Sequence, residues 1–82
     1  MTVWMVRAEY DPEARVWYVS DSDIPGIAAD AETLETLAEK IGQMLPDLLD
    51  VNAALIADTA RLSGPHSIRI VAHHERDFAV AA

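Results

Sequence analysis

The sequence contains no cysteine, which excludes a disulfide framework and thiolate chemistry. Basic residues are also scarce, because 6 Lys and Arg stand against 14 Asp and Glu, for a net charge of −8. We therefore expect no direct nucleic-acid binding, since Lys and Arg supply most phosphate contacts. No apolar run approaches the roughly 20 residues of a membrane span, and the start MTVWMVRAEY lacks the features of a signal peptide. These absences predict a soluble, cytoplasmic protein with no membrane partner.

What the sequence does contain is 82 residues at 51% hydrophobic composition, which fits one small domain over residues 1–82. A domain of this size buries a smaller share of its surface than a larger one. Self-association, most simply as a homodimer, would cover the remaining apolar surface. Leu55, Ile56 and Leu62 are surplus apolar residues that such a contact could use.

Four segments have strand patterns. Residues 2–10 alternate, with Trp4, Val6, Ala8 and Tyr10 on one face, and DPEA supplies the Asp and Pro of a turn. RVWYVS, rich in β-branched and aromatic residues, predicts the second strand. The Pro-Gly pair that follows permits a sharp turn, and a short third strand is expected over 27–30. SIRIVAH alternates again and predicts the last strand.

One helix is predicted over residues 33–51, where apolar residues recur at intervals of three and four. Pro46 lies inside this pattern and predicts a bend or a restart, because proline removes one helical hydrogen bond and clashes with the preceding turn. A straight helix continuing past Asn52 would overshoot so small a domain, so a break is expected there. Whether residues 53–63 form a helix or a loop stays open.

The predicted order is β-β-β-α-β, an α+β fold. The first three strands form an antiparallel meander, and a helical crossover lays the last strand beside the first and parallel to it. The result is a four-stranded mixed sheet with one main helix on one face. Its two outer strands leave backbone groups unpaired unless something covers them.

No group of residues predicts catalysis, a metal site or a cofactor. His73 and His74 are adjacent, so on a strand they point to opposite faces and do not readily chelate one ion. Asp21 and Asp23 resemble a carboxylate pair, but aspartate beside a Pro-Gly turn is more often a turn former. We therefore expect a protein that is not an enzyme.

The segments AEYDPEARVWYVSDSDIPGI, ADAETLETLAEKI and LPDLLDVN resemble the HicB-like antitoxin group, in which an aspartate-hydrophobe-Pro-Gly turn precedes a Thr-Leu-Glu helix start. The resemblance covers residues 3–52 and, more weakly, SIRIVAHHER, and concerns in particular short, uncharacterised bacterial members. It implies a β-β-β-α-β fold similar to part of a ribonuclease H domain. For full-length members it implies binding and silencing of a small basic ribonuclease toxin. Those antitoxins carry a C-terminal DNA-binding segment that is missing after DFAVAA, so operator binding is not expected.

The charge distribution suits a basic protein partner. Residues 1–60 contain three basic and twelve acidic residues, a net charge of −9, whereas residues 61–82 sum to +1. Acids on such a surface would steer a cationic partner, and apolar anchors would supply affinity. The expected contact surface comprises Pro25, Ile27, Glu32, Glu35 and Glu39. The alternative is an orphan domain that binds a small ligand or serves as a subunit, with no toxin partner.

Overall fold

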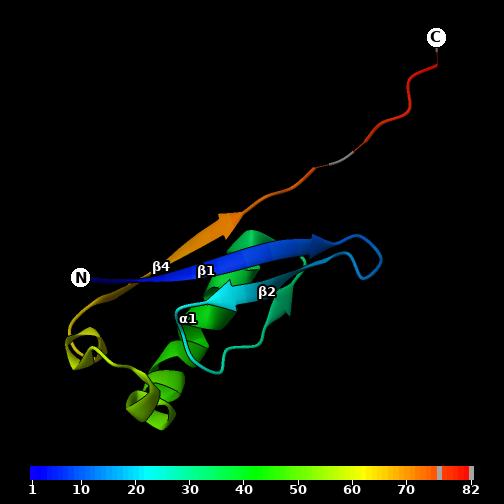
Figure 1. The fold of residues 1–82 in the computed structure, drawn as a ribbon. Coiled ribbons are helices and arrows are strands. Elements are labelled where there is room, and N and C mark those ends of the chain that lie inside the picture. The colour runs from blue at the N-terminus through cyan, green and yellow to red at the C-terminus, as the bar shows by residue number, and fades with distance from the viewer. Residues whose placement is uncertain (76, 82) are drawn as a thin grey trace.

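The chain folds into a four-stranded sheet with one helix on one face, as a computed structural model that describes residues 1–75 and 77–81 shows (Figure 1). The elements are β1 (Thr2–Asp11), β2 (Val16–Ser22), β3 (Asp30–Ala31), α1 (Leu34–Val51), the 3₁₀ helices η1 (Ala53–Leu55) and η2 (Thr59–Leu62), and β4 (His66–Ala72). The strand order is β3-β2-β1-β4, and only the β1–β4 pair is parallel. The predicted α+β class, meander and parallel fourth strand are confirmed.

The β1–β2 turn follows from the Asp and Pro of the DPEA segment. The Asp11 carboxylate accepts hydrogen bonds from the backbone amides of Glu13 and Ala14 at 3.0 and 3.3 Å. Arg15 then takes a left-handed conformation, with φ of 58°, and its amide donates to the Asp11 carbonyl at 2.7 Å. Aspartate is favoured at such turns because its side chain satisfies the backbone donors that the turn exposes.

The third strand begins later than the sequence pattern predicts, at Asp30 rather than at residue 27, and it has only two residues. Gly26 has φ of 76°, so the chain leaves the Pro-Gly turn in a conformation that other residues rarely adopt. Of residues 27–29, Ala29 accepts a bond from the Val19 amide at 3.2 Å, and regular pairing with β2 starts at Asp30. The prediction of a strand over 27–30 was therefore wrong in its bounds.

Helix α1 begins where the Thr33 hydroxyl accepts a hydrogen bond from the Thr36 amide at 3.1 Å, an N-cap. Its buried residues, spaced by four, are Leu37, Ile41, Leu45 and Leu49. The helix continues through Pro46 to Val51, so no second helix starts after the proline. Pro46 has no amide hydrogen for the Gly42 carbonyl, and both residues lie on the exposed side of the helix.

The predicted break at Asn52 is confirmed, because α1 ends there. Residues 53–63, left open between helix and loop, contain the two short 3₁₀ helices η1 and η2. Ile56, between them, is buried and joins the core. In the connection between the end of α1 and the start of β4, Ile56 is thus the residue that is fully packed into the core.

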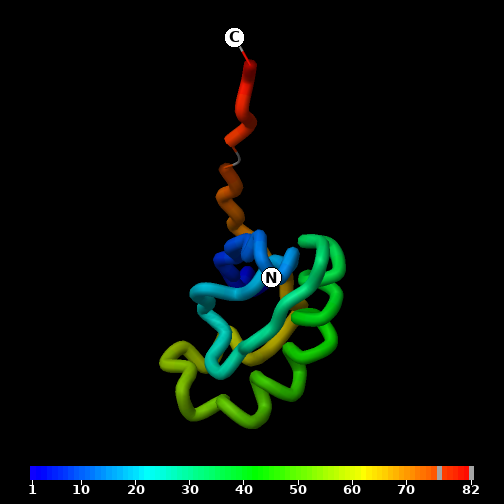
Figure 2. Tube along the Cα trace, turned by 90° about the vertical axis from the view of Figure 1, so that its right-hand side faces the viewer, coloured from blue at the N-terminus to red at the C-terminus, as the bar shows by residue number. Residues whose placement is uncertain are grey.

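The core lies between α1 and the sheet. β1 contributes Trp4, Val6 and Ala8, whereas its alternate residues are exposed on the opposite face, which none of the described elements covers. Beyond β4 the chain runs straight away from the body (Figures 1 and 2), which gives the molecule extents of 58 × 20 × 19 Å. Among the described residues, no helix is long and apolar enough to cross a membrane.

Candidate functional site

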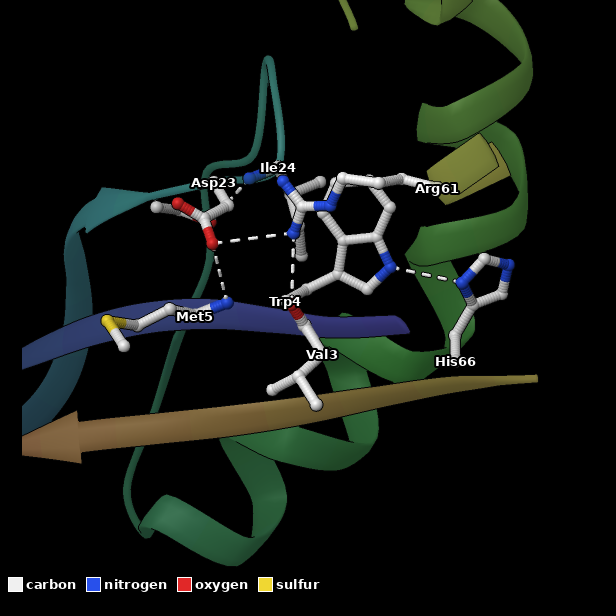
Figure 3. Close-up of polar contacts among 8 residues, drawn as sticks. Val3, Trp4, Met5, Asp23, Ile24, Arg61 and His66 are labelled. Carbon is white, nitrogen blue, oxygen red and sulfur yellow. Dashed lines mark hydrogen bonds and ion pairs between the residues drawn. The ribbon is translucent and has the colours of Figure 1, made fainter. Parts of the chain in front are cut away.

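A polar cluster surrounds Trp4 at the start of β1 (Figure 3). The Trp4 side chain is fully buried, and its indole Nε1 donates a hydrogen bond to His66 Nδ1 at 3.1 Å. An imidazole that accepts at Nδ1 carries its proton on Nε2 when neutral. The bond therefore fixes both the ring orientation and the tautomer of His66 at the first residue of β4.

Arg61 closes this cluster from the crossover. Its guanidinium carbon lies 4.1 Å from the Trp4 ring centroid, a cation–π contact, and its Nη2 donates to the Val3 carbonyl at 2.9 Å. The same nitrogen lies 3.5 Å from Asp23 Oδ2, which also accepts from the Met5 amide at 3.1 Å. Figure 3 shows Arg61 between the indole and the Asp23 carboxylate. These bonds tie η2 and the exit of β2 to β1, which is a structural role.

The cluster contains no arrangement suited to catalysis. Asp23 is paired with Arg61, and Asp21 accepts from the adjacent Ser22 amide at 2.9 Å, so the two aspartates serve different contacts. The two neighbouring histidines are also separated: His73 pairs with Glu75 at 3.1 Å, whereas His74 lies against Tyr10 and Trp17. Within residues 1–75 and 77–81, no three His, Asp or Glu side chains are grouped to hold a metal ion.

A cavity of about 630 Å³ lies beside the cluster, between α1 and β4. Its lining residues are Gly42, Leu45, Pro46, Leu49, Asp50, Ala53, Leu62, His66 and Ile68. The wall is mainly apolar, and His66 and Asp50 are its titratable side chains. Sequence reasoning missed this cavity. Its lining residues come from α1, the crossover and β4, which no local sequence pattern shows to be neighbours.

The structure divides the predicted partner surface into two parts. Glu32, Glu35 and Glu39 are exposed at the N-terminal end of α1. Pro25 and Ile27 are half-buried at the other end, where the Asn52 side chain donates to the Pro25 carbonyl at 3.3 Å. At 1.5 Å per residue, Glu35 and Asn52 are about 25 Å apart along the helix. The five residues therefore do not form one compact patch.

The outward face of α1 is acidic along its whole length. Glu35, Glu39, Asp47 and Asp50 are exposed, and the one basic residue of the helix, Lys40, donates to the Asp30 carbonyl at 2.7 Å. In the described part of the chain, the ion pairs are those of Arg61 and His73, so these four carboxylates have no cationic partner there. We call these four residues the acidic helix face.

Comparison with known proteins gives a similar solved structure and a matching family. The chain is 36% identical to the hypothetical protein TTHA1013 from the extremely thermophilic bacterium Thermus thermophilus, whose crystal structure superposes with a TM-score of 0.71. The match covers 93% of this chain and 99% of that one. No curated protein matches significantly. The family described as a domain of unknown function, DUF1902, matches residues 3–76. The chain therefore belongs to the DUF1902 family.

Proposed function

We propose that this domain acts by binding a small basic protein, a toxin nuclease in the manner of HicB-like antitoxins, and performs no chemistry of its own. The observation that carries the proposal is the acidic helix face, whose four carboxylates lie exposed along one element, without a cationic partner among the described residues. Such a surface raises the rate of encounter with a cationic partner and fixes its orientation.

Apolar anchors for this contact lie at the C-terminal end of α1. Val51 and Leu55 are 79% and 70% exposed, close in the chain to Asp47 and Asp50. The half-buried Pro25 and Ile27 approach the same end through the Asn52 contact. Interfaces typically combine an apolar centre with a charged rim. In this proposal the partner contacts acidic residues along α1 and apolar residues at its C-terminal end, beside the Pro-Gly turn.

The test uses the purified domain and the small basic protein encoded in the adjacent reading frame. Reversing Glu35 and Glu39 to lysine should slow association about tenfold or more at low salt, because steering depends on local charge. The matched control reverses Glu9 and Asp21, two exposed acids of the sheet, with the same change in net charge. Circular dichroism would verify that both variants are folded.

The control variant separates the acidic helix face from net charge alone. Equal slowing by both variants would show that only net charge matters. Failure of the wild-type domain to bind any basic protein encoded beside it would overturn the antitoxin function.

One observation favours a second candidate function, the orphan ligand-binding domain. The cavity between α1 and β4 has the volume of a small-molecule site, and the polar side chains of His66 and Asp50 are among its lining residues. Thermal unfolding of the domain with and without a small-molecule library would test it, since a ligand of the native state raises the midpoint.

A further inference from the structure

Residues 73–75 and 77–81, which follow β4, lead away from the body of the molecule (Figures 1 and 2). This segment starts beside the sheet, where the His74 ring lies 5.1 Å from that of Tyr10 and 5.4 Å from that of Trp17. Further along, Phe78 and Val80 are 74% and 87% exposed. Two large apolar side chains on this segment are thus mostly exposed to solvent, although a domain of this size has few apolar residues to bury.

The strand from which this segment emerges has an open edge. β4 is the last strand in the sheet order and is paired on one side with β1. An open edge presents backbone donors and acceptors to any extended chain of suitable pattern. On the helix side of that edge lies the apolar cavity, whose wall includes His66 and Ile68 of β4 itself.

The side-chain pattern of the segment matches this edge. Ile68 and Ile70 of β4 pack against the core, whereas Arg69 and Val71 are exposed on the uncovered face. His74 contacts Tyr10 and Trp17 and so keeps the even-numbered positions on the helix side. If residues 77–81 pair as a strand, their side chains alternate, so Phe78 and Val80 would share one face and Asp77 would lie on the other.

We propose that two copies of this chain pair through β4 and the segment that follows it, so that residues 77–81 of each copy lie antiparallel along β4 of the other. With the two-fold axis at His73, Phe78 lies opposite Ile68 and Val80 opposite His66. Both apolar side chains then enter the cavity between α1 and β4 of the second copy. At about 3.3 Å per residue, the seven steps from 73 to 80 would span about 23 Å once paired as a strand, the same length as the seven steps from 73 back to 66.

Charge and symmetry support the same register. It places Asp77 of one copy opposite Arg69 of the other, an oppositely charged cross-strand pair on the uncovered face. The two-fold axis makes each of these contacts twice, as in any isologous dimer. The occupant of the cavity is therefore a second copy of the chain, recognised by its apolar pair and its aspartate.

The first test is the mass of the full chain by sedimentation between about 1 and 100 µM, because the population of a dimer depends on protein concentration. We expect a dimer. The variant Phe78→Ser/Val80→Ser should be a monomer throughout, while Val71→Ser, on the uncovered sheet face, should stay dimeric. Because the segment lies outside the body, the double variant should keep the wild-type circular dichroism spectrum.

Disulfide cross-linking tests the register of the pairing. The chain has no native cysteine, so any cross-link must come from the cysteine that is introduced. His73→Cys places a thiol on the two-fold axis and should form a covalent dimer under mild oxidation. Val71→Cys, two residues earlier on the same face, lies about 13 Å from its symmetry mate and should cross-link far less. Asp77→Arg should weaken the dimer, and adding Arg69→Asp should restore it.

Three results would overturn the proposal: a wild-type monomer at the highest concentration, a dimer that Phe78→Ser/Val80→Ser leaves unchanged, or equal cross-linking of the two cysteine variants. A monomer whose cavity instead binds a small molecule would also assign the cavity to a ligand. Every variant keeps the four residues of the acidic helix face, but Asp50 also lines the cavity, so binding of the basic partner is measured separately with wild type and variants.

Discussion

Replacing Gly26 by alanine should destabilise the fold by about 2–3 kcal/mol. Gly26 has φ of 76°, a left-handed conformation that is about 1–2 kcal/mol unfavourable for an alanine. A Cβ at this position would also lie 3.1 Å from Asn52 Nδ2. Since that nitrogen donates to the Pro25 carbonyl, its displacement would lose a hydrogen bond worth about 1 kcal/mol.

Two other glycines separate these contributions. Gly64 has φ of 81°, but nothing lies within 4 Å of an added Cβ, so Gly64→Ala should show the backbone cost alone. Gly42 lies in α1 with open space around it and no positive φ, so Gly42→Ala should stabilise the protein by about 0.5–1 kcal/mol. The order of stability should be Gly42→Ala, wild type, Gly64→Ala, Gly26→Ala.

Urea unfolding followed by circular dichroism would measure these differences at constant m-value. For a domain of this size, a loss of 2–3 kcal/mol corresponds to a melting temperature about 10 °C or more below that of the wild type. Equal effects at Gly26 and Gly64 would refute the part assigned to Asn52. A Gly26→Ala variant as stable as the wild type would refute the conformational argument as well.

Substitutions at three further positions test the core and the helix start by the same unfolding measurement. Thr33→Ala removes the N-cap bond to the Thr36 amide and should destabilise by about 1 kcal/mol, whereas Thr33→Ser should not. Ile41→Ala empties a fully buried site under the sheet and should destabilise by about 2–5 kcal/mol. Trp4→Phe removes the donor to His66 and should destabilise by at least about 1 kcal/mol; a neutral result would contradict the structural role given to that bond.

Local periodicity was enough to predict most of the fold. The four-residue spacing of Leu37, Ile41, Leu45 and Leu49 identified α1, and all four are buried. The alternation in β1 identified its inner face in the same way. Such patterns work because one face of each element meets one core, so burial repeats with the period of the element.

Features that depend on distant contacts were not predictable. The start of β3 is displaced by a Pro-Gly turn whose conformation is supported from Asn52, at the far end of α1. The cavity likewise arises because α1 and β4, remote in sequence, do not close completely against each other. Neither the displaced start of β3 nor the cavity can therefore be read from a local sequence pattern.

The division of the predicted partner surface has a simple geometric cause. An extended chain advances about 3.3 Å per residue and a helix 1.5 Å, so the few residues from Ile27 to Glu32 travel most of the length of α1. Pro25 and Glu32 are therefore close in sequence but lie at opposite ends of the helix. The five residues were predicted to form one surface patch because they are close in sequence. They form two patches because the extended chain covers more length per residue than the helix does.

The two proposals share one residue, Asp50, which lines the cavity, whereas Glu35, Glu39 and Asp47 of the acidic helix face are not among the lining residues. Antiparallel pairing of the β4 strands about an axis perpendicular to the sheet would keep both helices on one face of a continuous sheet. The two acidic helix faces would then point to the same side of a dimer with a net charge of −16, twice the −8 of one chain. A basic partner would meet a broader acidic field than a monomer presents, which raises its encounter rate without any new contact. Exchange of the segment after β4 would therefore assist binding through charge, with Glu35, Glu39 and Asp47 of each α1 outside the lining of the cavity that the segment fills.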